Sequence, residues 1–102
     1  MIRHIVMFTL KEHAHGNPKA ENIRIIKAKL EALRGVIPGL LRMDVGVDFS
    51  ATDTSADMVL DSDFTTRAAL DAYIVHPAHQ ALVPFITEVR SERRLVDFEI
   101  NS

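Results

Sequence analysis

Apolar and polar residues alternate along four stretches of this chain, at residues 2–10, 40–49, 57–64 and 93–100. A period of two places successive side chains on opposite faces, which is the pattern of a β-strand. In the first stretch both faces hold apolar residues, so we expect both faces to be covered. One face would carry Ile2, His4, Val6, Phe8 and Leu10, and the other Arg3, Ile5, Met7 and Thr9.

The second and third predicted strands each divide into two faces, and the polar residues 50–55 between them are typical of a hairpin connection. The second strand would place Leu41, Met43, Val45, Val47 and Phe49 opposite Arg42, Asp44, Gly46 and Asp48. The third would place Met58, Leu60 and Phe64 opposite Asp57, Val59, Asp61 and Asp63. We interpret the aspartates as a solvent face, because they lack the glycine and terminal glutamate of a calcium loop.

A spacing of three and four residues between apolar positions predicts a helix from about Lys19 to Arg34. Gly35 is expected to end this helix, and Ile37-Pro38-Gly39 to form a turn. The preceding residues 12–18 read as a loop, in which we expect His13 and His15 to be solvated.

A second helical stretch, residues 66–90, is interrupted in its middle. Pro77 cannot donate a backbone hydrogen bond and disfavours the helical conformation of His76. We therefore expect one helix, capped by Thr65 or Thr66, to end near Val75, and a second helix to begin with Pro77. Pro84 would kink the second helix or limit its length. The predicted apolar faces are Ala69, Leu70, Tyr73 and Ile74 before the break, and Ala78, Leu82, Ile86 and Val89 after it.

The resulting order, β-α-β-β-αα-β, is that of a ferredoxin-like α+β fold, with helices on one face of an antiparallel sheet. A chain of 102 residues suits a single domain over residues 1–102. The other face of the sheet would leave Ile5, Met7 and the apolar residues of the second strand in water. We therefore predict a homodimer in which two sheets pack face to face and close a barrel-like core.

Composition excludes several classes of function. The net charge is −2 without a basic block, which argues against nucleic-acid binding. Apolar runs such as residues 5–8 are too short to span a membrane, and no signal peptide is visible. The absence of cysteine excludes disulfides, thiol catalysis and cysteine-ligated metals, and is compatible with the cytoplasm. No serine-nucleophile motif, phosphate loop or dinucleotide fingerprint is present.

Three segments carry a resemblance that extends over essentially the whole chain: Met1–Phe8, Asp71–His79 and Val96-Asp97-Phe98. The chain resembles the stress-responsive A/B barrel (Dabb) family in these motifs, in length and in element order. The resemblance implies a dimeric α+β barrel but not one particular reaction. We expect no cofactor. Many members of that family have no assigned activity and are linked to stress responses. One plant branch, olivetolic acid cyclase, closes a linear polyketide by aldol condensation.

The residues that match the catalytic set of that branch are His4, Tyr73 and His79. The branch's other pocket tyrosine has no counterpart, because Tyr73 is the only tyrosine of this chain. His79, near the positive end of the helix that Pro77 starts, would be neutral at pH 7 and able to accept a proton from a carbon acid. Tyr73 would polarise a carbonyl or hold an enolate oxygen, together with His4.

Each of these residues also has a structural interpretation. His79 and His4 suit semi-buried histidines with backbone or core hydrogen-bond partners, and Tyr73 suits a core aromatic residue. We include His76, Phe8 and Leu82 as candidate lining of the same ligand pocket. His4, His76 and His79 as metal ligands are disfavoured, because no carboxylate has ligand spacing.

Two main functional hypotheses follow, and a third rests on fold analogy. The first is a small dimeric protein that binds an apolar organic molecule between sheet and helices. The second is an enzyme for cyclisation or another enolate reaction, with His79 as base and Tyr73 and His4 as oxyanion partners. The third is a cofactor-free monooxygenase, since such enzymes share this dimeric architecture.

Overall fold

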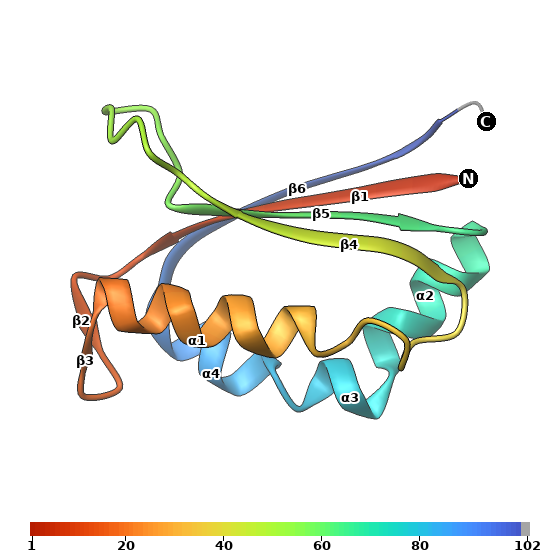
Figure 1. The fold of residues 1–102 in the computed structure, drawn as a ribbon, viewed down its shortest axis with the longest axis horizontal. Helices are drawn as coiled ribbons and strands as arrows, with labels where there is room; N and C mark the ends of the chain where they lie inside the picture. The colour runs from red at the N-terminus through yellow and green to blue at the C-terminus, as the bar shows by residue number, and fades with distance from the viewer. Residues whose placement is uncertain (101–102) are drawn as a thin grey trace.

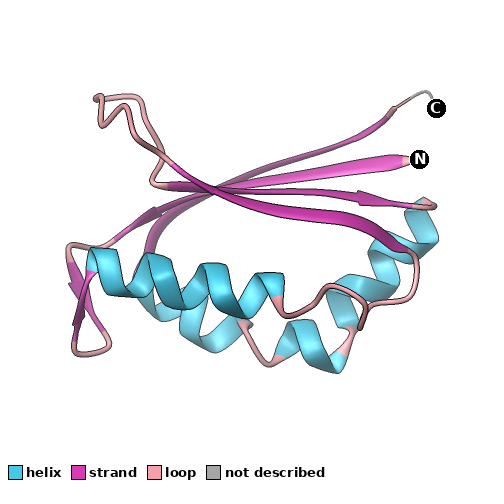
Figure 2. Cartoon of the chain, in the orientation of Figure 1, coloured by secondary structure: helices cyan, strands magenta, loops and turns pink. Residues whose placement is uncertain are grey.

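The structure, a computed structural model, describes residues 1–100 of the chain. Four strands form one antiparallel sheet in the order β4-β5-β1-β6: β1 (Ile2–Leu10), β4 (Leu40–Val47), β5 (Met58–Phe64) and β6 (Arg90–Glu99). The helices are α1 (Lys19–Glu31), α2 (Arg67–Val75), α3 (Pro77–Gln80) and α4 (Val83–Val89), and all lie on one face of this sheet (Figures 1 and 2). The predicted ferredoxin-like α+β fold is confirmed. Within residues 1–100, no helix has the length and apolar character needed to cross a membrane.

The alternation of β1 is confirmed residue by residue. Its face toward the helices is buried from Ile2 to Leu10, and His4 is the one polar residue there, only 4% exposed. Between this face and the helices lies the hydrophobic core, to which β1 contributes Val6 and Phe8, β5 Leu60 and Phe64, and the helices Ile26, Leu30, Leu70, Tyr73 and Val89. The site discussed below therefore lies within the core layer between sheet and helices.

The segment before α1 is more ordered than predicted. β2 (His13–Ala14) and β3 (Asn17–Pro18) form a two-residue hairpin, with His15 and Gly16 at its turn, both with positive φ. His15 is exposed, but its Nδ1 lies 3.1 Å from the carboxylate of Glu88 and its ring packs against Phe85. This contact between hairpin and α4 was not predicted.

The first helix ends three residues before the predicted Arg34, and residues 32–36 continue as turns. Gly35 and Gly39 both adopt positive φ, +76° and +81°. The chain then passes close to α2: a Cβ atom built on Gly39 would lie 2.6 Å from the Cβ of Ala69. Glycine at this position thus permits the close approach of the turn to α2.

The break near Pro77 is confirmed, and the chain breaks a second time near Pro84. Thr66 caps α2 by accepting a hydrogen bond from the Ala69 amide, and His76 is extended (φ −65°, ψ 135°). Instead of one helix after Pro77 there are two, because α3 ends at Gln80 and Pro84 occupies the first turn of α4, where its missing N–H costs nothing. Ile74 lies at the edge of the predicted apolar face of α2 and is 42% exposed.

The predicted face of β4 is correct only in its middle. Met43 and Val45 are buried under the helices, but the pairing with β5 shifts between Leu40 and Arg42, which leaves Leu41 unpaired and 56% exposed. Val47 ends the strand, and Phe49 lies beyond it, 96% exposed, in the connection that projects past the sheet away from the helices (Figure 1).

The face of the sheet that no helix covers is divided into an ionic half and an apolar half. The ionic half lies on β4 and β5, where Arg42 extends from β4 to Asp61 (2.6 Å) and Asp63 (3.0 Å) of β5. Asp63 was predicted to be solvated, but it is only 5% exposed. Hydrogen bonds from Arg3 and Arg42 lower its pKa to about 2. On the β1–β6 side, Met7, Val96 and Phe98 are 41–50% exposed.

Candidate functional site

A cavity of about 210 Å³ lies between the sheet and the helices. β1, β5 and β6 form its floor, and α1, α2, α3 and α4 its walls. The three predicted catalytic residues all contribute to its lining, together with nine others: His4, Val6, Phe8, Leu30, Leu60, Tyr73, His79, Val83, Ile86, Thr87, Arg90 and Arg93. The structure thus brings together residues that are 75 positions apart in the sequence.

Tyr73 lies at the centre of an aromatic cluster. Its side chain is 1% exposed, and its ring centroid lies 4.4 Å from that of His79, 5.1 Å from that of Phe64 and 6.2 Å from that of His4. The hydroxyl oxygen has no hydrogen-bond partner among residues 1–100. Burial raises the pKa of Tyr73 to about 12, against a smaller opposing effect of the Arg93 charge. The hydroxyl is therefore a hydrogen-bond donor throughout the physiological pH range.

Of the two ring nitrogens of His79, Nδ1 makes a hydrogen bond within residues 1–100, and Nε2 makes none there. Its Nδ1 lies 2.9 Å from the carbonyl oxygen of Ile74. A carbonyl only accepts hydrogen bonds, so Nδ1 carries the proton and the neutral ring keeps a lone pair on Nε2. Burial lowers the pKa of His79 despite this hydrogen bond, and the neighbouring His4 and Arg93 lower it further. The ring is thus neutral at pH 7 because its partial burial disfavours the charged form. The helix dipole that the sequence suggested contributes little, since α3 is a single turn.

His4 is held by a residue that the sequence analysis did not identify. Its Nδ1 is hydrogen-bonded to the carboxylate of Asp97, which lies directly opposite on β6. His4 also anchors the sheet through its backbone, since its carbonyl accepts a hydrogen bond from Ser62. A carboxylate on Nδ1 fixes the orientation of an imidazole ring, so Asp97 positions His4 relative to Tyr73. The alternation of β6 could have suggested this pair only once its pairing register with β1 was known.

Arg90 and Arg93 also line the cavity, and the sequence did not predict them there. Among the lining residues, they are the only ionisable ones besides the histidines and Tyr73. Arg93 lies opposite Phe8 in the sheet and Arg90 opposite Leu10, so both are on the helix-facing side. The sequence placed Arg90 in a helix, whereas it is the first residue of β6.

Of the three residues predicted to line a ligand pocket, Phe8 lines the cavity, whereas His76 and Leu82 are not among its lining residues. His76 caps α3, where its Nδ1 accepts a hydrogen bond from the Ala78 amide at 3.0 Å, and Leu82 packs in the core, 8% exposed. Within the described part of the chain, no three histidine, aspartate or glutamate side chains are grouped as metal ligands would be.

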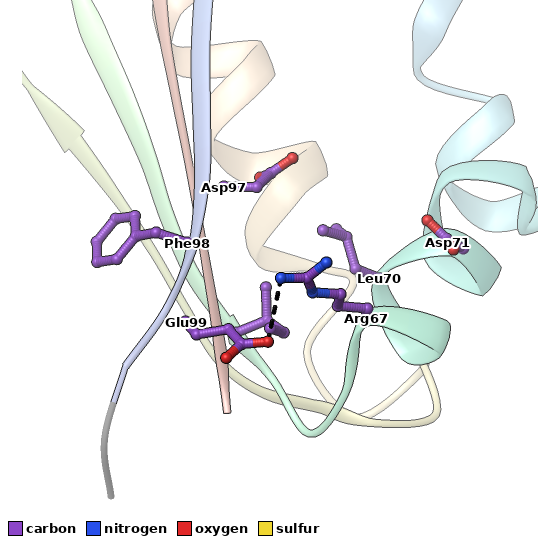
Figure 3. A pocket seen from close by; sticks show the side chains of 7 residues that line it. Arg67, Leu70, Asp71, Asp97, Phe98 and Glu99 are labelled. Atoms are coloured by element: carbon purple, nitrogen blue, oxygen red, sulfur yellow. Dashed lines mark ion pairs between the residues drawn. The ribbon is translucent and has the colours of Figure 1, made fainter.

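A second hollow, of about 420 Å³, lies beneath the outer end of β6 (Figure 3). Asp97 and Glu99 point from β6 toward α2, whereas Phe98 points to the opposite side of the sheet. Arg67 of α2 forms an ion pair of 3.2 Å with Glu99. Asp97 therefore contacts His4 on one side and lines an open hollow on the other.

Comparison with known proteins identifies several solved structures of the same fold. A dimeric ferredoxin-like protein of unknown function from Jannaschia sp. is 30% identical, with a TM-score of 0.75 over 97% of this chain and 98% of that one. A dimeric protein of unknown function and ferredoxin-like fold from Bacteroides fragilis is 26% identical, with a TM-score of 0.82 over 97% and 95%.

Hydroxynitrile lyase from Passiflora edulis shares the fold at 16% identity, with a TM-score of 0.78 over 98% of this chain and 93% of that one. No curated protein matches the chain. The model of the stress responsive A/B barrel domain matches residues 2–100. Since that match covers almost the whole chain, and the fold and motifs agree with it, the protein belongs to the stress-responsive A/B barrel (Dabb) family.

Proposed function

We propose that the cavity between sheet and helices binds a small organic molecule, which accepts a hydrogen bond from Tyr73. The observation that carries this proposal is the Tyr73 hydroxyl, which is buried and has no partner among the described residues. Leaving a buried polar group unsatisfied costs roughly 1–3 kcal/mol. A carbonyl or hydroxyl of a ligand in the cavity would remove that cost, while the apolar walls would contact the ligand's body.

The chemistry that this geometry suits best is proton abstraction next to a carbonyl. Tyr73, with its raised pKa, stays protonated and donates to the carbonyl oxygen, whereas His79, with its lowered pKa, stays neutral and accepts the proton on Nε2. The electrons of the broken C–H bond move to the oxygen held by Tyr73, which gives an enolate. Two groups whose pKa values move in opposite directions have the properties of an acid and base pair. Aldol cyclisation is one reaction of such an enolate.

The binding test is a titration followed by NMR of the histidine and tyrosine ring resonances. Acetophenone, a ketone with one ring, is the probe. We expect the signals of His79 and Tyr73 to shift along one saturation curve, and Tyr73→Phe to weaken binding by about tenfold, the loss of one buried hydrogen bond. His15→Gln, a change at an exposed histidine outside the cavity, is the control and should bind as the unaltered protein does. Absence of saturable shifts would disprove the proposal.

The enolate step has its own readout, which needs no knowledge of the final product. In D2O, the protein should accelerate deuterium incorporation at the methyl group of acetophenone, because each enolate formed is reprotonated from solvent. His79→Gln should abolish the acceleration, and His15→Gln should retain it. If ketone binds but exchange is not accelerated, the protein is a binding protein and the enzyme hypothesis is wrong.

We also propose that the protein is a homodimer joined through the face of the sheet that no helix covers. The support is the patch of Met7, Val96 and Phe98, each 41–50% exposed, on the apolar half of that face. The related proteins from Jannaschia sp. and Bacteroides fragilis are described as dimeric. Contiguous apolar side chains of this kind are typical of a protein–protein interface.

A further inference from the structure

The two arginines of the cavity reach it because of an irregularity in β6. Along a regular strand, residues three positions apart lie on opposite faces. Between Thr9 and Leu10 the pairing register shifts: Thr9 pairs with Glu92, but Leu10 pairs with Arg90. Ser91 is thus the extra residue of a β-bulge, and Arg90 and Arg93 lie on the same, helix-facing side. Bulges commonly redirect a side chain toward a functional site.

These two cations have no counter-ion among residues 1–100, since neither guanidinium forms an ion pair or a side-chain hydrogen bond there. The acidic residues next to them in sequence are already engaged, Glu88 with His15 and Glu92 with Arg94. The cavity lining contains no carboxylate. The charge that the protein presents to a ligand in this cavity is therefore positive, although the net charge of the chain is −2.

We propose, on the basis of the binding function above, that the ligand is an organic anion with a body about one ring in size and a carboxylate paired with Arg93. An apolar cavity of about 150 Å³ accommodates benzene, so about 210 Å³ suits one ring with a short substituent. Arginine suits a carboxylate because its planar guanidinium binds both oxygens at once. Arg93 lines the cavity together with Tyr73 and His79, so an anion paired with Arg93 would lie close to both residues.

The test compares acids with their neutral amides: benzoate with benzamide, and phenylacetate with phenylacetamide. Affinities are measured by NMR titration at low ionic strength. We expect each acid to bind about tenfold or more tightly than its amide, a free-energy difference of about 1.4 kcal/mol. Arg93→Gln should reduce the ratio to near one. Raising the salt from about 50 to 500 mM should weaken acid binding and leave amide binding unchanged, because salt screens the ion pair.

Arg94→Gln is the matched control, because Arg94 is the next residue of the same strand but faces the uncovered side of the sheet and pairs with Glu92. It should keep the full preference for acids. Equal binding of acids and amides, or an acid preference that Arg93→Gln leaves intact, would overturn the anion proposal while the binding function stands. If neither the acids and amides nor acetophenone shift the His79 and Tyr73 signals, the binding function falls, and the anion proposal with it.

Discussion

The Nδ1 atom of His79 lies 2.9 Å from the carbonyl oxygen of Ile74, across the break between α2 and α3. The last carbonyls of a helix lack intrahelical partners, and the amide of Ala78, four residues after Ile74, donates to His76 instead. His79 and Gln80 therefore both donate to the Ile74 carbonyl. The break at Pro77 thus creates the acceptor that fixes the tautomer of His79 and leaves its Nε2 free for chemistry.

The lowered pKa of His79 should make the protein less stable in mild acid. The unfolded chain, with a histidine pKa near 6.5, binds a proton before the folded protein does. Stability is therefore complete above pH ~6.5 and declines as the pH falls from there toward the lower pKa of the folded state. Urea denaturation at pH 7.5 and pH 5.5 measures the decline. His79→Gln should reduce it, and an unchanged decline in this variant would assign the pH dependence to other groups.

Tyr73→Phe should separate stability from function. The change removes a buried hydroxyl without a described protein partner and keeps the ring that packs against His79 and Phe64. The free energy of unfolding without ligand is therefore expected to stay the same or rise by about 1 kcal/mol, while ligand affinity and deuterium exchange fall. Equilibrium urea denaturation provides the measurement. A clear loss of stability would mean that the hydroxyl makes a stabilising hydrogen bond, through water, in the ligand-free protein.

Gly39→Ala should destabilise the fold much more than Gly35→Ala. Both glycines have positive φ, which costs an alanine roughly 1–2 kcal/mol. At Gly35 nothing lies within 4 Å of the added Cβ, but at Gly39 it would lie 2.6 Å from the Cβ of Ala69 and must displace α2. We expect about 1 kcal/mol for Gly35→Ala and about 3 kcal/mol or more for Gly39→Ala, measured by thermal or urea denaturation. Equal effects would contradict the close approach of the turn to α2.

The strands and helices follow from periodicity. His4, Tyr73 and His79 are polar positions within apolar patterns, but it is the resemblance to the Dabb family that singles them out. The structure places all three in the lining of one cavity, and their catalytic role stays a prediction. The residues that accompany them in the site could not be predicted from periodicity. Asp97, Arg90 and Arg93 reach the site through the register of β6 on β1 and through the bulge at Ser91, and neither is encoded in alternation within a single strand. Asp63 was misassigned for a similar reason: it is paired with Arg3 and Arg42, which extend from the two neighbouring strands. Local pattern predicts elements, whereas pairing between strands decides which side chains meet.

The proposed dimer interface can be tested with two neighbouring apolar residues of β6 that are about equally exposed but face opposite sides of the sheet. Val96, opposite Ile5, lies on the uncovered face, and Leu95, opposite Val6, lies on the helix-facing side; they are 50% and 49% exposed. Val96→Asp would bury a charge in the interface and should give a monomer in sedimentation equilibrium at micromolar concentration. Leu95→Asp should remain a dimer. If the unaltered protein sediments as a monomer, the apolar half of this face has another role; if both variants dimerise, the interface lies elsewhere.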